Sequence, residues 1–279
     1  MRKRVLVTGA SGYIASQLLP ALRKRYELTL LDVKRETREG KSIEDITIAD
    51  LSDPNIEAYR KYFKGVDAVV HLSYHRSGEA EKRGYYDERT NVDMAHNVYQ
   101  VSFEEGVERV VAASSIRAVH WYEKLLRERK LDLVYHDTDP LADSHYGWSK
   151  IAYEKEGFIY ACGSMGRKMG VILIRISAPR EIRVEDFVGD PEGYRRDLAA
   201  YISERDLQQL FCKSIEEKNI ENRYGVPYHI FFGTSNNSRK IWSITNARKV
   251  VGYEPEDDSE VKFSDDIREF LVEGSKNGC

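Results

Sequence analysis

The segment Val5-Leu6-Val7-Thr8-Gly9-Ala10-Ser11-Gly12-Tyr13-Ile14-Ala15 contains the strongest local signal in the chain. A short apolar run leads directly into a turn with two glycines, and an amphipathic stretch follows. That order predicts a strand, a tight turn and the start of a helix. Gly9 would allow the turn, and Gly12 would let a pyrophosphate group approach the backbone N–H groups at the helix N-terminus. Ala15 replaces the third glycine of the usual pattern, and its small side chain still permits close helix packing.

The following sequence repeats this alternation of short apolar runs and longer amphipathic stretches. Further short runs cover residues 28–32, 46–49, 68–72 and 109–114, and residues 171–176 indicate another buried strand. This βαβ order predicts an α/β fold, a Rossmann-type doubly wound parallel sheet with helices on both faces. We expect residues 1–177 to form that dinucleotide-binding domain. Residues 178–279 are expected to form a small C-terminal substrate lobe that partly returns to the sheet.

Composition argues against several classes of partner. Charged residues make up 32% of the 279 residues, but the formal net charge is only −3, which does not favour nucleic acid as a partner. The apolar run after Met1-Arg2-Lys3-Arg4 is too short for a signal peptide or a membrane span, so we expect a cytoplasmic protein without a membrane partner. Cys162, Cys212 and Cys279 are widely spaced and odd in number, so no metal site is expected.

Asp32 ends the second apolar run, about 20 residues beyond the glycines. A carboxylate at this position can accept hydrogen bonds from both ribose hydroxyls of NAD and would repel a 2′-phosphate, so NAD is the expected cofactor. Lys34 and Arg35 leave NADP open, because a rearranged loop could direct either cation at that phosphate. Asp32 could instead be a loop carboxylate that caps the strand end.

Tyr146 and Lys150 stand four residues apart on a predicted helix, so one helix face would carry both side chains. A lysine beside a tyrosine favours the phenolate, which would lower the tyrosine pKa and make it a general acid/base at an alcohol or carbonyl. A solvated helix face is the alternative. Ser114 and Ser115 close a strand at the carboxyl edge, where ligands sit in open α/β sheets.

These motifs, in this order, resemble the extended short-chain dehydrogenase/reductase superfamily, which includes nucleotide-sugar epimerases, dehydratases and sugar dehydrogenases. The resemblance implies that Ser115, Tyr146 and Lys150 are the catalytic residues. It also implies a set of cofactor-binding residues from the turn, the strand ends and two helices. That set comprises Gly9, Ser11, Gly12, Tyr13, Ile14, Asp32, Asp50, Leu51, Leu72, Ser73, Asn91, Tyr146 and Lys150.

The C-terminal part is similar to uronate dehydrogenases and related sugar dehydrogenases, through residues 201–207, 232–237, Trp242 and 251–257. This implies NAD-dependent oxidation of a sugar hydroxyl, at the anomeric carbon of a uronate, an aldose or a sugar phosphate, to give a lactone. A nucleotide-sugar epimerase with retained NAD would use the same residues and is the alternative. A non-catalytic NAD-binding protein is a third reading. By analogy with the superfamily, a homodimer is expected.

Uronate dehydrogenases usually show Asn-His after the catalytic serine, whereas this chain has Ile116-Arg117. Arg117 would suit a carboxylate or phosphate, since its guanidinium group presents a planar fork to oxyanions. A salt bridge from Arg117 to an inserted helix at residues 121–131 is the alternative. We therefore expect an anionic sugar substrate. The candidate substrate-binding residues are Arg76, Ser77, Ser115, Arg117, Ser177 and Arg196.

Overall fold

The computed structural model describes residues 2–76 and 84–273. Within them, seven parallel strands form one sheet in the order β3-β2-β1-β4-β5-β6-β7. The strands are β1 (Arg4–Thr8), β2 (Glu27–Asp32), β3 (Ile46–Ile48), β4 (Ala68–His71), β5 (Arg109–Ser115), β6 (Gly170–Ile176) and β7 (Tyr228–Gly233). The expected Rossmann-type sheet is confirmed. The strand order reverses between β1 and β4, and ligands bind beyond the carboxyl ends of the strands at such a point.

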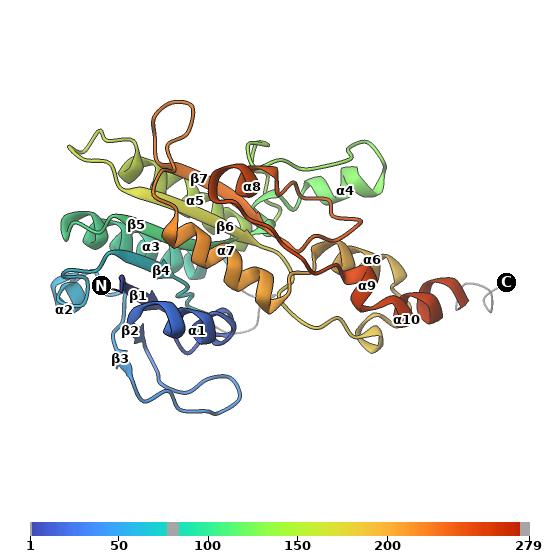
Figure 1. Cartoon of the computed structure of the whole chain (residues 1–279), viewed down its shortest axis with the longest axis horizontal. Helices are drawn as coiled ribbons and strands as arrows, with labels where there is room; N and C mark the ends of the chain where they lie inside the picture. The colour runs from blue at the N-terminus through green and yellow to red at the C-terminus, as the bar shows by residue number, and fades with distance from the viewer. Residues whose placement is uncertain (1, 77–83, 274–279) are drawn as a thin grey trace.

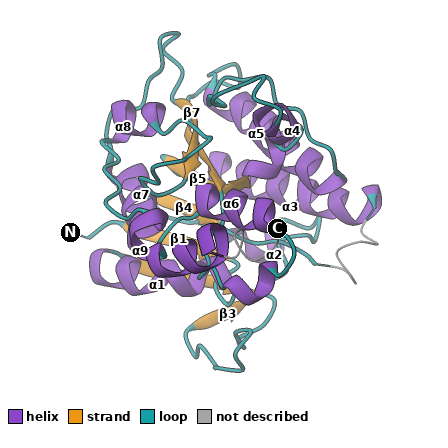
Figure 2. Ribbon diagram, turned by 90° about the vertical axis from the view of Figure 1, so that its right-hand side faces the viewer, coloured by secondary structure: helices purple, strands orange, loops and turns teal. Residues whose placement is uncertain are grey.

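Helices cover both faces of this sheet (Figures 1 and 2). α1 (Tyr13–Arg25) packs against α7 (Glu204–Glu216) on one face, and α3 (Tyr85–Glu104) packs against α5 (His145–Ala161) on the other. The strands alternate between the two layers, since Val5 and Val7 belong to the α1 and α7 core while Leu6 belongs to the α3 and α5 core. Strands buried on both faces require the near-continuous apolar runs seen in the sequence.

Shorter elements complete the chain. They are α2 (Glu57–Arg60), α4 (Tyr122–Arg127), α6 (Pro191–Ala200), α8 (Thr245–Val251), α9 (Ser259–Lys262) and α10 (Ser264–Ile267), with the 3₁₀ turns η2 (Ile116–Val119) and η3 (Val184–Phe187) and the π-helical turn η4 (Arg268–Glu273). α6, α9 and α10 lie together at one end of the molecule (Figure 1). They share a small core that includes Tyr194, Leu198 and Phe263.

The part of the chain after residue 177 contributes to both regions. β7 and α7 belong to the sheet and its helical layer, whereas η3, α6, α9 and α10 form a helical cap. None of the helices in the described ranges is both long enough and apolar enough to cross a membrane. The same ranges contain no cluster of three histidine, cysteine or acidic side chains placed to hold a metal ion.

Candidate active site

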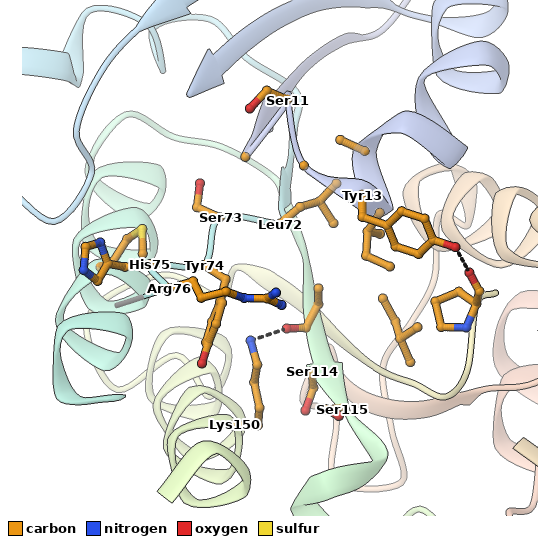
Figure 3. Close-up of a pocket in the computed structure, with 18 of the residues that line it drawn as sticks. Ser11, Tyr13, Leu72, Ser73, Tyr74, His75, Arg76, Ser114, Ser115 and Lys150 are labelled. Atoms are coloured by element: carbon orange, nitrogen blue, oxygen red, sulfur yellow. Dashed lines mark hydrogen bonds between the residues drawn. The ribbon is translucent and has the colours of Figure 1, made fainter. Parts of the chain in front are cut away.

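A cavity of about 980 Å³ lies along the carboxyl ends of the strands, where the strand order reverses. It brings together most of the residues predicted from the sequence. Those that line it are Gly9, Ser11, Gly12, Tyr13, Ile14, Asp32, Asp50, Leu51, Leu72, Ser73, Arg76, Ser115, Arg117, Tyr146, Lys150, Ser177 and Arg196. Figure 3 shows the turn after β1 on one side of the cavity and Lys150 of α5 on the other. Ser77 lies outside the described residues.

The glycine turn forms the wall at the N-terminus of α1. Gly9 has a φ of 68°, and a Cβ atom there would lie 2.6 Å from the backbone nitrogen of Ser73. Glycine is therefore required both for the backbone conformation and for the close approach of the segment that follows β4. Gly12 immediately precedes α1, and Ala15 is fully buried in the first turns of that helix. The bare backbone at the start of α1 fits a pyrophosphate group, because its N–H groups and the helix dipole favour negative charge.

Asp32 is held in place at the end of β2. Its Oδ2 accepts hydrogen bonds from the backbone nitrogen and the hydroxyl of Ser11, both at 2.9 Å, and its Oδ1 accepts one from the Val33 nitrogen at 2.7 Å. Of the two cations considered from the sequence, Lys34 lines the cavity, whereas the Arg35 side chain donates to the Ile46 carbonyl at 3.2 Å. The fixed carboxylate suits a ribose diol.

The other predicted cofactor residues differ in their positions. Asp50 and Leu51 line the cavity, with Asp50 Oδ1 accepting from the Ser52 nitrogen at 2.9 Å. Asn91 is fully buried outside the cavity lining. Its Oδ1 accepts from the His75 nitrogen at 2.7 Å and its Nδ2 donates to the His75 carbonyl at 3.0 Å. Asn91 thus braces the loop after β4, and the structure places it behind the cavity wall.

The three predicted catalytic side chains meet between β5 and α5. Ser115 ends β5, and its hydroxyl hydrogen-bonds Tyr146. Gly147 allows α5 to approach the backbone that follows β5, because a Cβ atom at residue 147 would lie only 2.4 Å from the carbonyl oxygen of Arg117. The Lys150 ammonium donates to the Ala113 carbonyl at 3.2 Å and lies 5.7 Å from the centroid of the Tyr146 ring.

The protonation of this pair differs from the sequence-based expectation. Burial raises the pKa of Tyr146 above its ordinary value, and the Ser115 hydrogen bond and two nearby arginines only partly oppose it. The expected lowering of the Tyr146 pKa by Lys150 is therefore wrong for these side chains by themselves. Burial also lowers the pKa of Lys150 to about 8, against the opposing charges of Glu88 and Glu154.

The arginines of the cavity are not equally available to an anion. Arg196 donates to Glu123 through Nε at 3.2 Å and through Nη2 at 3.0 Å, and its Nη1 donates to Asp197 at 2.8 Å. Among the described residues no carboxylate forms an ion pair with Arg117, whose Nη1 lies 2.8 Å from Nε2 of His120. Figure 3 shows the Arg76 side chain reaching into the cavity toward Lys150.

The inserted helix α4 supplies Glu123, a residue that sequence reasoning did not connect with the site. Its carboxylate is buried beside His120, at 3.3 Å from Nε2, and beside Arg196. Although burial opposes it, hydrogen bonds from these two partners lower the pKa of Glu123 to about 2. A hydrogen bond to Glu123 is the largest influence on His120 and raises its pKa. Arg117 therefore contacts the inserted helix indirectly, through His120, instead of through the direct salt bridge considered from the sequence.

Two further residues beside the reaction centre had no sequence signal. Tyr74 packs edge-on against Tyr146, with ring centroids 5.5 Å apart, and its hydroxyl donates to the carboxylate of Glu88. Neither residue belongs to a motif, and both are too far from Tyr146 in the sequence for helix or strand periodicity to place them beside it. Burial and contact alone bring them to the site.

Comparisons with known proteins agree with this geometry. The model of the NAD dependent epimerase/dehydratase family matches residues 5–187. An NAD-dependent glucose-6-phosphate dehydrogenase of Haloferax volcanii is 32% identical, over 98% of each chain. A uronate dehydrogenase of Pseudomonas syringae pv. tomato is 25% identical, over 92% of this chain and 83% of its own.

Among solved structures, a mutated uronate dehydrogenase superposes with a TM-score of 0.73 and 24% identity, over 96% of this chain and 86% of its own, which supports the fold. The family model and the full-length relative together confirm the resemblance inferred from the motifs. The chain belongs to the NAD-dependent epimerase/dehydratase family, and its cofactor is NAD.

Proposed function

We propose that this family member, an NAD-dependent sugar dehydrogenase, oxidises the anomeric carbon of an anionic sugar to a lactone, with glucose 6-phosphate as the first candidate substrate and a hexuronate as the second. The observation that carries the proposal is the cavity itself. Ser115, Tyr146 and Lys150 line it together with Arg76 and Arg117, and both arginines lower the pKa of Tyr146. The full-length similarity to a glucose-6-phosphate dehydrogenase supports the choice of a phosphosugar.

The chemistry follows from the roles of these side chains. The glycine turn and Asp32 would hold NAD, which would supply the acceptor for the hydride of the anomeric carbon. Ser115 and Tyr146 hold the hydroxyl on that carbon, and Tyr146 removes its proton as the C=O bond forms. Positive charge from Lys150, together with that of the oxidised nicotinamide when NAD is bound, would offset the burial that raises the pKa of Tyr146. The product is a lactone, and water opens it without a further side chain.

The charges around the cavity support an anionic substrate. Arg196 is already bound by Glu123 and Asp197, so little of its charge remains for a ligand. The Arg117 guanidinium group contacts the ring of His120, and no carboxylate in the described part of the chain pairs with it. We therefore assign the main contact with the substrate anion to Arg117, with Arg76 as a second cation.

A substrate screen tests the proposal. The purified protein is incubated with NAD and glucose 6-phosphate, a hexuronate, unphosphorylated glucose or a nucleotide sugar, and NADH formation is followed. We expect turnover with an anionic sugar and much weaker turnover with glucose. Tyr146→Phe should lower kcat on the order of 10²–10⁴-fold while NAD still binds in calorimetry. Interconversion of the nucleotide sugar without net NADH would contradict the dehydrogenase and favour an epimerase.

A further inference from the structure

A buried carboxylate stands behind the reaction centre, on the face of α3 that packs against α5. Glu88 is 1% exposed. Its Oε2 accepts from the Ser149 hydroxyl at 2.8 Å and from Asn91 Nδ2 at 3.5 Å, and its Oε1 accepts from the Tyr74 hydroxyl. Within the described residues no cation forms an ion pair with Glu88, so its hydrogen bonds there come from neutral groups. Because the carboxylate is buried and no described cation pairs with it, its electrostatic field acts strongly on neighbouring groups.

Of the three side chains that donate to Glu88 in the described part of the chain, Ser149 and Tyr74 lead to the acid/base pair. Ser149 stands directly before Lys150 in α5. The Tyr74 ring packs edge-on against Tyr146 and lies beneath the Lys150 ammonium, which is 5.2 Å from the ring centroid. Figure 3 shows Tyr74 and Lys150 at the same wall of the cavity. Glu88 is thus linked to Lys150 through the neighbouring Ser149 and to Tyr146 through the ring of Tyr74.

We propose that Glu88 is a positioning residue for the hydride-transfer reaction, and that its buried carboxylate sets the pH range over which Tyr146 and Lys150 work. The inference rests on the proposed function, because it concerns the working pH range of the same acid/base pair. Glu88 itself does not line the cavity. It acts through Tyr74, Ser149 and its electrostatic field.

The sign of that field is the same for both groups. A negative charge favours the protonated ammonium of Lys150 and disfavours the phenolate of Tyr146, so Glu88 raises the pKa of each. Of the other groups, Glu154 also raises the pKa of Lys150, whereas the Ser115 hydroxyl and two arginines lower the pKa of Tyr146. The groups facing Lys150 are Glu154, His71 and Tyr153, and those facing Tyr146 are Ser115, Arg117, Arg76 and Tyr153.

Glu88→Gln removes the charge and nearly preserves the shape of the side chain. Oxidation requires Tyr146 to be ionised while Lys150 is protonated, so the two limbs of the kcat profile report the pKa values of this coupled pair. Without the carboxylate both pKa values fall, and both limbs should move to lower pH by about one unit. Glu88→Asp, which restores the charge, should return the profile toward that of the wild type.

Two further variants separate an electrostatic role from a structural one. Tyr74→Phe retains the ring but deletes a hydrogen bond whose positive end faces the carboxylate and offsets part of its field, so the profile should move the other way, to higher pH. Asp93→Asn removes one negative charge from the exposed side of α3, where Asp93 lies 3.5 Å from Arg89, and should leave the profile in place. If Glu88→Gln fails to fold, the shift in Tyr74→Phe decides the question.

A second readout needs no substrate. Tyrosine labelled with ¹³C at Cζ reports the titration of each phenol by NMR, and the Tyr146 signal is the one lost in Tyr146→Phe. Its midpoint should fall by about one pH unit in Glu88→Gln and stay constant in Asp93→Asn. Lower kcat at every pH with unmoved limbs and an unmoved Tyr146 titration would overturn the inference. Failure of all sugars to reduce NAD would instead sink the proposed function, while the titration still tests Glu88.

Discussion

Arg117 and Arg196 line the same cavity but present different charges to a ligand. The Arg196 guanidinium group is occupied by Glu123 and Asp197, and Glu123 is itself 6% exposed. Within the described residues, the Arg117 guanidinium group hydrogen-bonds the ring of His120 and forms no ion pair with a carboxylate. A cation already paired with carboxylates offers an incoming anion little net attraction, so the two arginines should respond differently to truncation.

Arg117→Ala is expected to raise KM for the anionic sugar about tenfold or more, with a much smaller change in kcat, since a charge-assisted hydrogen bond to the substrate is lost. Arg196→Ala should chiefly lower the thermal unfolding midpoint, because Glu123 loses its main cation inside the protein. Steady-state kinetics and differential scanning fluorimetry on both variants provide the comparison. An unchanged KM in Arg117→Ala would remove that residue from substrate binding.

The turn between β1 and α1 combines a backbone requirement with a tertiary contact. Its left-handed glycine is predictable from the motif, because only glycine adopts φ near 68° without strain. The approach of the Ser73 backbone to within 2.6 Å of a Cβ atom at residue 9 is not predictable, because it depends on how β4 ends. The turn therefore forms one wall of the cavity and also fixes the distance between that wall and the loop that carries Tyr74.

Gly9→Ala should weaken NAD binding by about tenfold or more, because relieving the clash with Ser73 moves the backbone that surrounds the pyrophosphate. Gly106→Ala is the matched control, since Gly106 has a φ of 79° but a Cβ atom there would meet no other atom within 4 Å. Both variants should lose about 1 kcal/mol of folding free energy from the strained φ, and only Gly9→Ala should lose NAD affinity. Calorimetric titration with NAD measures this difference, and equal affinities in the two variants would contradict it.

The two halves of the chain share one core. Val5 near the N-terminus and Tyr253 near the other end belong to the same hydrophobic cluster, and β7 pairs with β6 along its whole length. The fully buried ion pair between Arg175 of β6 and Glu154 of α5 also lies close to β7, because the Tyr228 hydroxyl donates to the Glu154 carbonyl at 2.6 Å. Residues on either side of position 177 therefore depend on one another for burial.

A fragment of residues 1–177 is expected to remain unfolded or to aggregate, because the loss of β7 and α7 exposes the apolar face of β6. The full chain should unfold in urea with coincident transitions by circular dichroism and tryptophan fluorescence. The same measurements on the fragment provide the check. A cooperative transition in the fragment would show that the N-terminal region folds independently.

Local rules account for what could be predicted from the sequence. The glycine turn, the carboxylate of Asp32 and the pairing of Tyr146 with Lys150 follow from short-range requirements of turns, strand ends and helix periodicity. The alternation of apolar runs predicted the sheet, and the resemblance carried by these motifs supplied most of the residues that line the cavity. The raised pKa of Tyr146 could not be foreseen, because it depends on burial.

The contacts of Glu123 and Glu88 were equally out of reach. Glu123 reaches Arg196 and Glu88 reaches Ser149 across 73 and 61 positions of the chain. Such distant pairs meet only when helices pack on the sheet, and no sequence spacing records that packing. The chemistry of the site was therefore readable from local patterns, whereas the charges that tune it arise from long-range contacts and from the exclusion of water.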